Sequence, residues 1–263
     1  EVPWVGSIGA EFSAAKITNS RAIGTFGSII SATMQAMHIK EKTGPFRFKQ
    51  FSIGHDPRVM KVGTDAVLLG AWASHEGPAH ILDIGTGSGV IALMMAQRFP
   101  TAQVTAIDLD EASVTLATKN FTLSPYSDRL AAIHLPVQQF FAENKLYDLI
   151  VSNPPFFTGG AFTHQGERQV MRHTTKLSHN ELLCSVRNLL APSGTFAVVL
   201  PYLEGLRFIE LAGLYHLYTH KQLRVRSLAD KKVERLLLGL KLQPGEMEVK
   251  ELVIQQSTKA HDY

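Results

Sequence analysis

Hydrophobic and polar residues along this chain form short apolar runs that are separated by longer stretches with helical periodicity. We predict strands at the continuous apolar runs, which are typical of a parallel sheet covered on both faces, over residues 81–84, 104–108, 131–135, 147–152 and 195–200. We predict helices where apolar residues recur on one face, over residues 90–98, 111–120, 137–143, 179–190 and 203–214. Strands that alternate with helices in this way predict an α/β fold with a doubly wound, mostly parallel sheet.

Two hairpin-like patterns flank this alternation. Residues 46–51 alternate apolar and polar side chains, which favours a half-exposed strand or a hairpin arm. Residues 223–226 and 235–242 suggest a hairpin near the carboxyl end. The second pattern is rich in basic residues that could meet RNA phosphates, although a solvated charged face is the simpler interpretation: Lys221, Arg224, Arg226, Lys231, Lys232 and Arg235.

The segment from Met60 to Trp72 is typical of a short loop that opens a helix. Thr64 or Asp65 is the expected cap, because both side chains accept hydrogen bonds from backbone N–H groups in the first turn. The face expected to point inward carries Val67, Leu68, Ala71 and Trp72.

The lead of the chain differs in composition from the rest of it. Ser, Ala, Thr, Gly and Ile dominate residues 1–44, and neither helical nor strand periodicity is sustained there. Met34 and Met37 are candidate natural starts. We therefore interpret residues 1–44 as a poorly structured lead or appendage and residues 45–263 as one domain.

The strand predicted at 147–152 ends in a chemically specific sequence, Asn153, Pro154, Pro155 and Phe156. Two consecutive prolines cannot extend a sheet ladder, so they must lie at or beyond the carboxyl edge, where open α/β sheets bind ligands. The segment offers the amide of Asn153, the unpaired carbonyl of Pro154 and the aromatic face of Phe156. The alternative is an ordinary strand-to-loop exit without a ligand.

Two acceptors and an aromatic plate suit a planar amine. The lone pair of an exocyclic NH2 is delocalised into its ring, so the amine is a poor nucleophile. Acceptors at Asn153 and Pro154 would favour the pyramidal geometry of a transition state, while Phe156 stacks on the ring.

A glycine-rich turn comes after the strand at 81–84, with Gly85, Gly87 and Gly89 in the sequence Asp-Ile-Gly-Thr-Gly-Ser-Gly. Glycines here let the backbone approach a ligand and direct the amino end of the next helix at it. The spacing differs from the dinucleotide fingerprint, and Asp83 suits the cationic amino-acid part of S-adenosylmethionine better than a pyrophosphate. A tight turn without a ligand remains the alternative.

The strand at 104–108 ends in a second acid, Asp108, about 20 residues after the glycines. That distance is expected for a carboxylate that binds ribose hydroxyls. Asp110 is the fallback for this role, with an alternative role as the cap of the following helix.

Composition limits what the domain can be. Hydrophobic residues make up 45% of the 263 and charged residues 19%, values ordinary for a globular protein, and no apolar run is long enough to span a bilayer. Cys184 is the only cysteine, which excludes an internal disulfide and favours a reducing, cytoplasmic setting. The histidines lack a metal-ligand spacing, so no metal is expected. The net charge of +3 is below that of an overt nucleic-acid coat.

The glycine turn, Asp108 and Asn153-Pro-Pro-Phe156, in this order, resemble the class I S-adenosylmethionine-dependent methyltransferases that modify planar amino groups. Within them, the stretch from Phe48 through His55 and Met60 to Trp72 is similar to the bacterial tRNA1(Val) adenine-37 N6-methyltransferases. The resemblance covers about residue 46 to the end of the chain. It implies a seven-stranded sheet with a reversed final hairpin, a tRNA substrate and a monomer.

The resemblance also implies a role for each motif. Residues flanking the methionine end of the cofactor would be Lys61, Gly63, Thr64 and Asp65. Residues wrapping it would be Asp83, Gly85, Thr86, Gly87 and Gly89. Asp108 and Leu109 would hold its ribose, and residues 153–156 would present the substrate adenine. Arg172, in a loop predicted over 158–172, would contact a phosphate or stack on a base, although a solvated loop charge is equally expected.

This chain departs from the family pattern in two places. Many relatives carry an acid after the third strand that binds the adenine of the cofactor, whereas here Gln138 or the backbone would have to supply that contact. Relatives also usually run on beyond the position of Tyr263. Three alternatives to adenine methylation remain: methylation of guanine N2 in rRNA, methylation of a glutamine amide in a release factor, and cofactor binding without catalysis.

Overall fold

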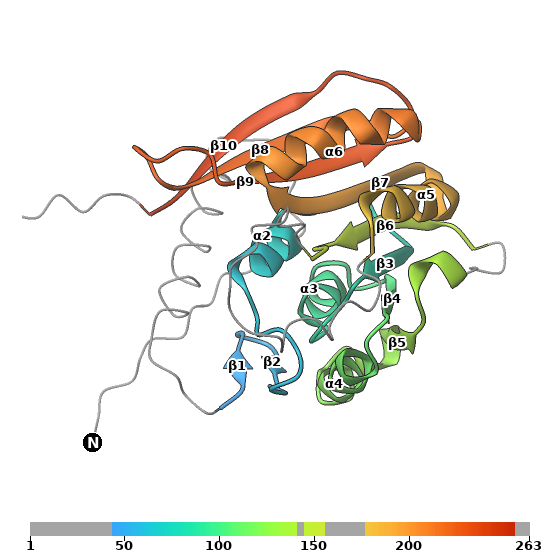
Figure 1. Cartoon of the computed structure of the whole chain (residues 1–263). Helices are drawn as coiled ribbons and strands as arrows, with labels where there is room; N and C mark the ends of the chain where they lie inside the picture. The colour runs from blue at the N-terminus through green and yellow to red at the C-terminus, as the bar shows by residue number, and fades with distance from the viewer. Residues whose placement is uncertain (1–43, 141–144, 156–176, 256–263) are drawn as a thin grey trace, which may run out of the picture.

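The computed structural model describes residues 44–140, 145–155 and 177–255. One sheet dominates it, and its strands are β3 (His80–Ile84), β4 (Gln103–Asp108), β5 (Leu130–His134), β6 (Tyr147–Ser152), β7 (Leu190–Pro201), β8 (Tyr218–Leu228), β9 (Arg235–Lys241) and β10 (Glu248–Gln255). A separate antiparallel pair consists of β1 (Phe46–Arg47) and β2 (Ser52–Ile53). Figure 1 shows this pair lying outside the main sheet, near the helix that comes after β4.

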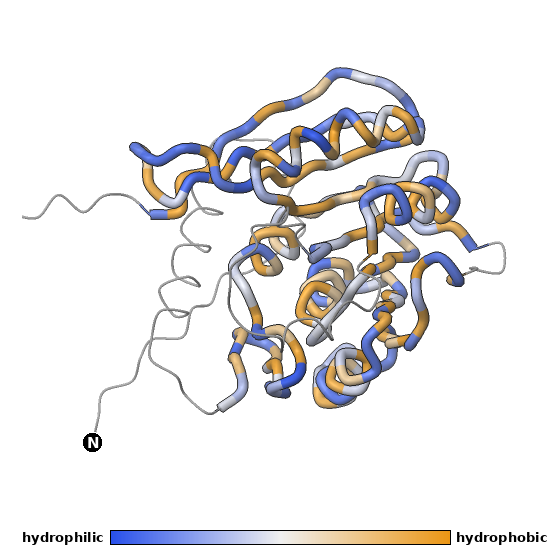
Figure 2. Tube along the Cα trace, viewed as in Figure 1, coloured by the Kyte–Doolittle hydropathy of each residue, from blue (hydrophilic) through white to orange (hydrophobic). Residues whose placement is uncertain are grey.

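Helices cover both faces of the sheet, as the continuous apolar strands predict. On one face, a hydrophobic core lies between the sheet and three helices, α2 (Thr64–Trp72), α3 (Val90–Arg98) and α4 (Glu111–Thr122). On the other face, a second core lies between the sheet and two helices, α5 (His179–Leu189) and α6 (Tyr202–Leu214). Neighbouring residues of one strand alternate between the two cores: Leu237 of β9 faces α2 and α3, and Leu236 and Leu238 face α6. Figure 2 shows hydrophobic residues along the central strands and on the helix sides that cover them.

The strand order is β10-β8-β9-β7-β6-β3-β4-β5. The five strands from β5 to β7 are parallel, and β9 is antiparallel to both β7 and β8, which confirms the predicted parallel sheet and reversed hairpin. The sheet has eight strands rather than seven, because β10 adds to its edge parallel to β8. Chain order reverses between β3 and β6, so these neighbours flank the position where open α/β sheets bind ligands.

Three predicted boundaries were wrong. Helix α2 is capped by Gly63, which makes no side-chain cap hydrogen bond, and Thr64 and Asp65 lie inside its first turn. In place of a helix over 137–143, the described residues contain a short 3-10 turn over Val137–Gln139. Strand β7 begins at Leu190, directly after α5, rather than at residue 195, so Pro192 and Gly194 lie inside the strand. A second 3-10 turn, Ser127–Arg129, precedes β5.

In the described part of the chain, no helix is both long enough and apolar enough to cross a membrane. The predicted lead over residues 1–44 lies almost entirely outside the described residues.

Candidate functional site

The turn between β3 and α3 is built by glycines in a left-handed backbone conformation. Gly85, Gly87 and Gly89 have φ values of 73°, 54° and 82°, which L side chains adopt only with strain. A Cβ at Gly89 would lie 2.6 Å from the Phe121 ring, so this glycine also permits close packing of the turn on α4. Within the part of the chain that the structure describes, a Cβ at Gly85 or Gly87 would meet nothing within 4 Å. Those two glycines therefore border open space at the carboxyl edge of β3, as a ligand-binding turn requires.

Asp83 is fully buried beneath this turn. Its Oδ2 accepts hydrogen bonds from the Thr86 hydroxyl at 2.7 Å and from the Ala92 N–H at 3.2 Å, while Oδ1 has no hydrogen-bond partner among the described residues. Burial raises the pKa of Asp83 to about 7, although both hydrogen bonds favour the ionised form. An unpaired, buried carboxylate oxygen beside a glycine turn fits a cationic ligand group, since a positive charge would offset the cost of ionisation.

Asp108 ends β4 and fastens the turn to its neighbouring strand. Its Oδ2 accepts a hydrogen bond from the Gly87 N–H at 2.8 Å, and its Oδ1 accepts one from the Asp110 N–H at 3.0 Å. Burial raises the pKa of Asp108, and these backbone hydrogen bonds act against that shift. Each carboxylate oxygen keeps a lone pair for a ligand hydroxyl. Asp110 accepts from the Ser113 N–H as the cap of α4, which is its predicted alternative role.

The Asn-Pro-Pro segment comes after β6 at the same edge as the glycine turn. Ser152 pairs with Ile84, and the Ser152 hydroxyl donates to the Ile84 carbonyl at 2.9 Å. Asn153 and Gly85 are therefore the first residues beyond a paired position on neighbouring strands. Asn153 is half-buried, Pro154 is buried and Pro155 is exposed, and the Asn153 amide makes no hydrogen bond within the described residues. The amide is thus left for a ligand.

The segment that opens α2 is held by an ion pair with the reversed hairpin. Arg235 Nε donates to both carboxylate oxygens of Asp65, at 2.9 Å and 3.1 Å. Lys61 is exposed, while Gly63 and Thr64 are half-buried. Asp65, for which the family resemblance implies a cofactor contact, and Arg235, expected on a solvated face or beside RNA phosphates, thus pair with each other in this structure.

Asn120 is a residue of the site that sequence reasoning missed. It is 1% exposed, its Oδ1 accepts the Gly54 N–H at 2.8 Å, and its Nδ2 donates to the Ser88 carbonyl at 2.8 Å. One amide thus ties the loop after β2 to the glycine turn. A signal for it was present, because Asn120 shares the apolar face of α4 with Leu116, Ala117 and Phe121.

Four predicted site residues gain no support from the structure. Phe156 and Arg172 lie outside the described residues. Leu109 is 46% exposed, and its carbonyl oxygen lies 2.9 Å from His134 Nε2. Gln138 is exposed and hydrogen-bonds to Glu181 near the start of α5. The roles of these four residues stay predictions.

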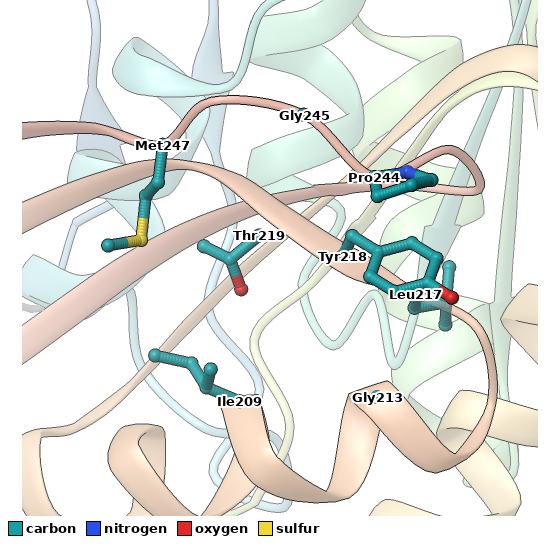
Figure 3. A pocket seen from close by; sticks show the side chains of 8 residues that line it. All are labelled: Ile209, Gly213, Leu217, Tyr218, Thr219, Pro244, Gly245 and Met247. Atoms are coloured by element: carbon teal, nitrogen blue, oxygen red, sulfur yellow. The ribbon is translucent and has the colours of Figure 1, made fainter.

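A cavity of about 260 Å³ lies elsewhere, between the end of α6, the start of β8 and the loop before β10. Figure 3 shows Ile209, Tyr218, Thr219 and Met247 among the side chains around it. Because β8 begins at the amino edge of the parallel strands, this cavity is at the opposite edge from the glycine turn. It takes no part in the site described above.

Comparison with known proteins agrees with this geometry. The family model described as "Methyltransferase small domain" matches residues 61–201, which contain the glycine turn and the Asn-Pro-Pro segment. The chain belongs to this family. Its methyltransferase small domain begins within the loop before α2 and ends with β7, so that the residues before Lys61 and the reversed hairpin are additions to the matched region.

Two curated relatives extend the match beyond that region. A tRNA1(Val) (adenine(37)-N6)-methyltransferase of Pectobacterium carotovorum is 43% identical over 218 residues, covering 82% of this chain and 88% of the relative. One of Vibrio parahaemolyticus is 43% identical, covering 83% and 91%. The crystal structure of a predicted O-methyltransferase from Agrobacterium tumefaciens superposes with a TM-score of 0.58 at 15% identity, covering 76% of this chain and 91% of that one, and shares the fold.

Proposed function

We propose that this protein transfers a methyl group from S-adenosylmethionine to the exocyclic N6 of an adenine in tRNA, with adenine 37 of tRNA1(Val) as the target named for its relatives. The observation that carries the proposal is the neighbouring position of β3 and β6, because it brings the glycine turn and Asn153 to one edge. A tRNA substrate also agrees with the cytoplasmic setting expected from the single cysteine.

The residues present fit the cofactor. Gly85 and Gly87 let the protein backbone come close to the cofactor, and Asp108 offers lone pairs to its ribose hydroxyls. The Oδ1 of Asp83, unpaired among the described residues, offers a negative charge to its ammonium group. When bound, S-adenosylmethionine supplies an electrophilic methyl group on a cationic sulfur.

Asn153 and Pro154 activate the acceptor. The Asn153 side-chain oxygen and the Pro154 carbonyl accept hydrogen bonds from the two N6 hydrogens. These bonds draw the nitrogen lone pair out of conjugation and direct it toward the glycine turn. The amine nitrogen forms the new bond to the methyl carbon, the electron pair of the broken carbon–sulfur bond stays on sulfur, and the extra proton leaves nitrogen for water. No strong base is required, because the methylated amine is far more acidic than its neutral product.

The proposal is tested by incubating the protein with methyl-labelled S-adenosylmethionine and total tRNA from a strain that lacks this activity, followed by digestion to nucleosides. We expect label in N6-methyladenosine, in the fragment that carries position 37. Labelled N2-methylguanosine from rRNA, or labelled glutamine from a release factor, would replace the adenine assignment. Cofactor binding measured by calorimetry without transfer to any of these substrates would reduce the protein to a binding module.

A further inference from the structure

The segment before α2, residues 44–61, forms an arm on the outside of the fold. It contains the β1–β2 hairpin and the loop that leads from β2 toward α2 (Figure 1). Four Lys and Arg residues against one acid give this arm a net charge of +3, which equals the net charge of the whole chain. The remaining residues therefore sum to no net charge, and the arm concentrates the positive charge of the protein.

The pairing in the hairpin directs its basic residues outward. Phe46 pairs with Ile53 and packs toward the core, while Arg47 pairs with Ser52 on the other side of the hairpin. Phe48 stacks on Phe51 with ring centroids 4.5 Å apart, which anchors the turn that carries Lys49. Arg47 and Lys49 are exposed, and neither makes an ion pair with any described residue. Both charges are therefore held in fixed places and available to a partner.

The arm is attached directly to the candidate site. Asn120 joins the Gly54 N–H to the Ser88 carbonyl in the glycine turn, with both hydrogen bonds at 2.8 Å. Farther along, the hydrogen-bonded Asp56 raises the pKa of Arg58, and the nearby charges of Asp110 and Glu111 add smaller effects, so the arm passes the amino end of α4 beside Asp108. A polymer that presents one nucleotide to Asn153 would thus have its backbone within reach of the arm.

The reversed hairpin, which is richer in basic residues, is a weaker candidate for a surface that contacts such a polymer. Arg235 is paired with Asp65, and Arg226 lies 3.4 Å from Glu251 of β10. Lys250 pairs with Glu248 of the same strand. The acids of β10, a strand that the sequence patterns did not predict, thus neutralise part of this surface. The arm has Asp56 as its single acid, and that acid pairs with Arg58 within the arm.

We infer that the arm is a docking surface for the phosphate backbone of the RNA substrate, with Arg47 and Lys49 as its phosphate contacts. This inference rests on the proposed function and adds to it the surface that holds the substrate. Phosphate contacts carry no sequence information, so the arm supplies affinity and orientation while the strand edge selects the base.

The test uses two double charge reversals. The arm variant combines Arg47→Glu and Lys49→Glu, and the matched control, at the opposite edge of the sheet, combines Lys145→Glu and Arg187→Glu. All four residues are exposed, and both variants change the net charge equally. Affinity for purified tRNA is measured by fluorescence anisotropy over a salt series, and affinity for S-adenosylmethionine by calorimetry. We expect the arm variant to weaken tRNA binding roughly tenfold and to reduce the slope of log K against log salt by about 1 to 2. The opposite-edge variant should match the wild type, and cofactor affinity should be unchanged in both.

Equal tRNA affinity and salt slope in the arm variant and the wild type would overturn the inference, as would equal losses in the two variants. Either result leaves the proposed function standing, provided that the wild type still methylates tRNA. A wild type that neither binds nor methylates tRNA would instead overturn the proposed function. Thermal unfolding of both variants checks that a lost affinity does not come from lost structure.

Discussion

Arg235 and Asp65, 170 positions apart in the sequence, form an ion pair in which the one N–H of Nε donates to both carboxylate oxygens, with Nε 2.9 Å from Oδ2. The pair joins the first residue of β9 to the first turn of α2, which directly follows the residues 61–63 that we expect beside the cofactor. The reversed hairpin therefore does more than extend the sheet, because it also holds the first turn of α2 in place.

Breaking this pair should affect cofactor binding more than stability. Since the side chains are 34% and 15% exposed, we expect Arg235→Gln to lower the free energy of unfolding by about 1 kcal/mol or less. We expect it to raise the dissociation constant for S-adenosylmethionine several-fold, because the 61–65 segment loses its anchor. Arg226→Gln, which breaks the Arg226–Glu251 pair farther along the hairpin, is the control and should bind the cofactor normally. Equal affinities in the two variants would contradict this positioning role.

Asn153 should matter for turnover and little for cofactor binding. Asn153→Ala removes one of the two proposed acceptors for the amine, and loss of one positioned polar group typically reduces kcat by roughly two orders of magnitude. Asn188→Ala, an exposed amide on α5, is the matched control. Single-turnover methylation and calorimetry separate the two effects. Near-normal turnover in Asn153→Ala would argue against the amide as an orienting group.

Asp83 should make both cofactor affinity and stability depend on pH. Its pKa in the folded protein is about 7, above that of an unfolded chain at about 3.9. Between these values the unfolded state binds fewer protons, so the Asp83 contribution to stability falls as pH rises from about 4 to 7 and is constant above. A cationic ligand favours the ionised form, so affinity for S-adenosylmethionine should rise from about pH 6 to 8 with release of a proton.

Asp83→Asn tests this linkage, because it keeps an acceptor for Thr86 and Ala92 and removes the titration. Calorimetry in two buffers with different ionisation enthalpies counts the released protons. We expect a flat affinity–pH profile and no proton release in the variant. Proton release near pH 7 that persists in Asp83→Asn would assign the titration to another group.

Two glycines of the turn should separate stability from binding. Gly89→Ala places a Cβ 2.6 Å from the Phe121 ring at a φ of 82°, so it should lower the free energy of unfolding by about 2–4 kcal/mol. Gly87→Ala meets no neighbour and should cost only the strain of a left-handed residue, about 1–2 kcal/mol. Its main effect should be weaker cofactor binding, since the new methyl group enters the open space. Thermal unfolding and calorimetry on both variants check this contrast.

Local patterns were enough to predict the parts of the site that stand at strand ends. Tyr147–Ser152 and the strand ending at Asp108 are marked by continuous apolar runs, and the alternation with helices indicates that they share one parallel sheet. Strand β10 could not be predicted in the same way, because Glu248, Lys250 and Glu251 make it look like a polar tail. Its structure comes from pairing with β8, which is a long-range interaction.

The pairs that organise the site were also invisible to local patterns. They gave no sign that Asp65 and Arg235 pair, because the proximity of these two residues depends on how the whole sheet is ordered. Asn120 differs, since a polar residue on the apolar face of an amphipathic helix marks a buried hydrogen-bonding role from sequence alone. What the sequence could not provide was its two partners, Gly54 and Ser88.

Asn120 should hold both the arm and the glycine turn in place. Asn120→Leu leaves the Gly54 N–H and the Ser88 carbonyl without their partner, so we expect a loss of about 2–5 kcal/mol in the free energy of unfolding. Asn120→Asp keeps the acceptor for Gly54 and loses the donor to Ser88, so it should detach the arm less and disturb the glycine turn more. Limited proteolysis within residues 44–61 and the affinity for S-adenosylmethionine report these two effects separately. We expect faster cleavage of the arm in Asn120→Leu than in Asn120→Asp, with weakened cofactor binding in both. If the arm of the Leu variant resists protease as the wild type does, the hydrophobic contacts of Phe46, Phe48 and Phe51 hold it in place instead.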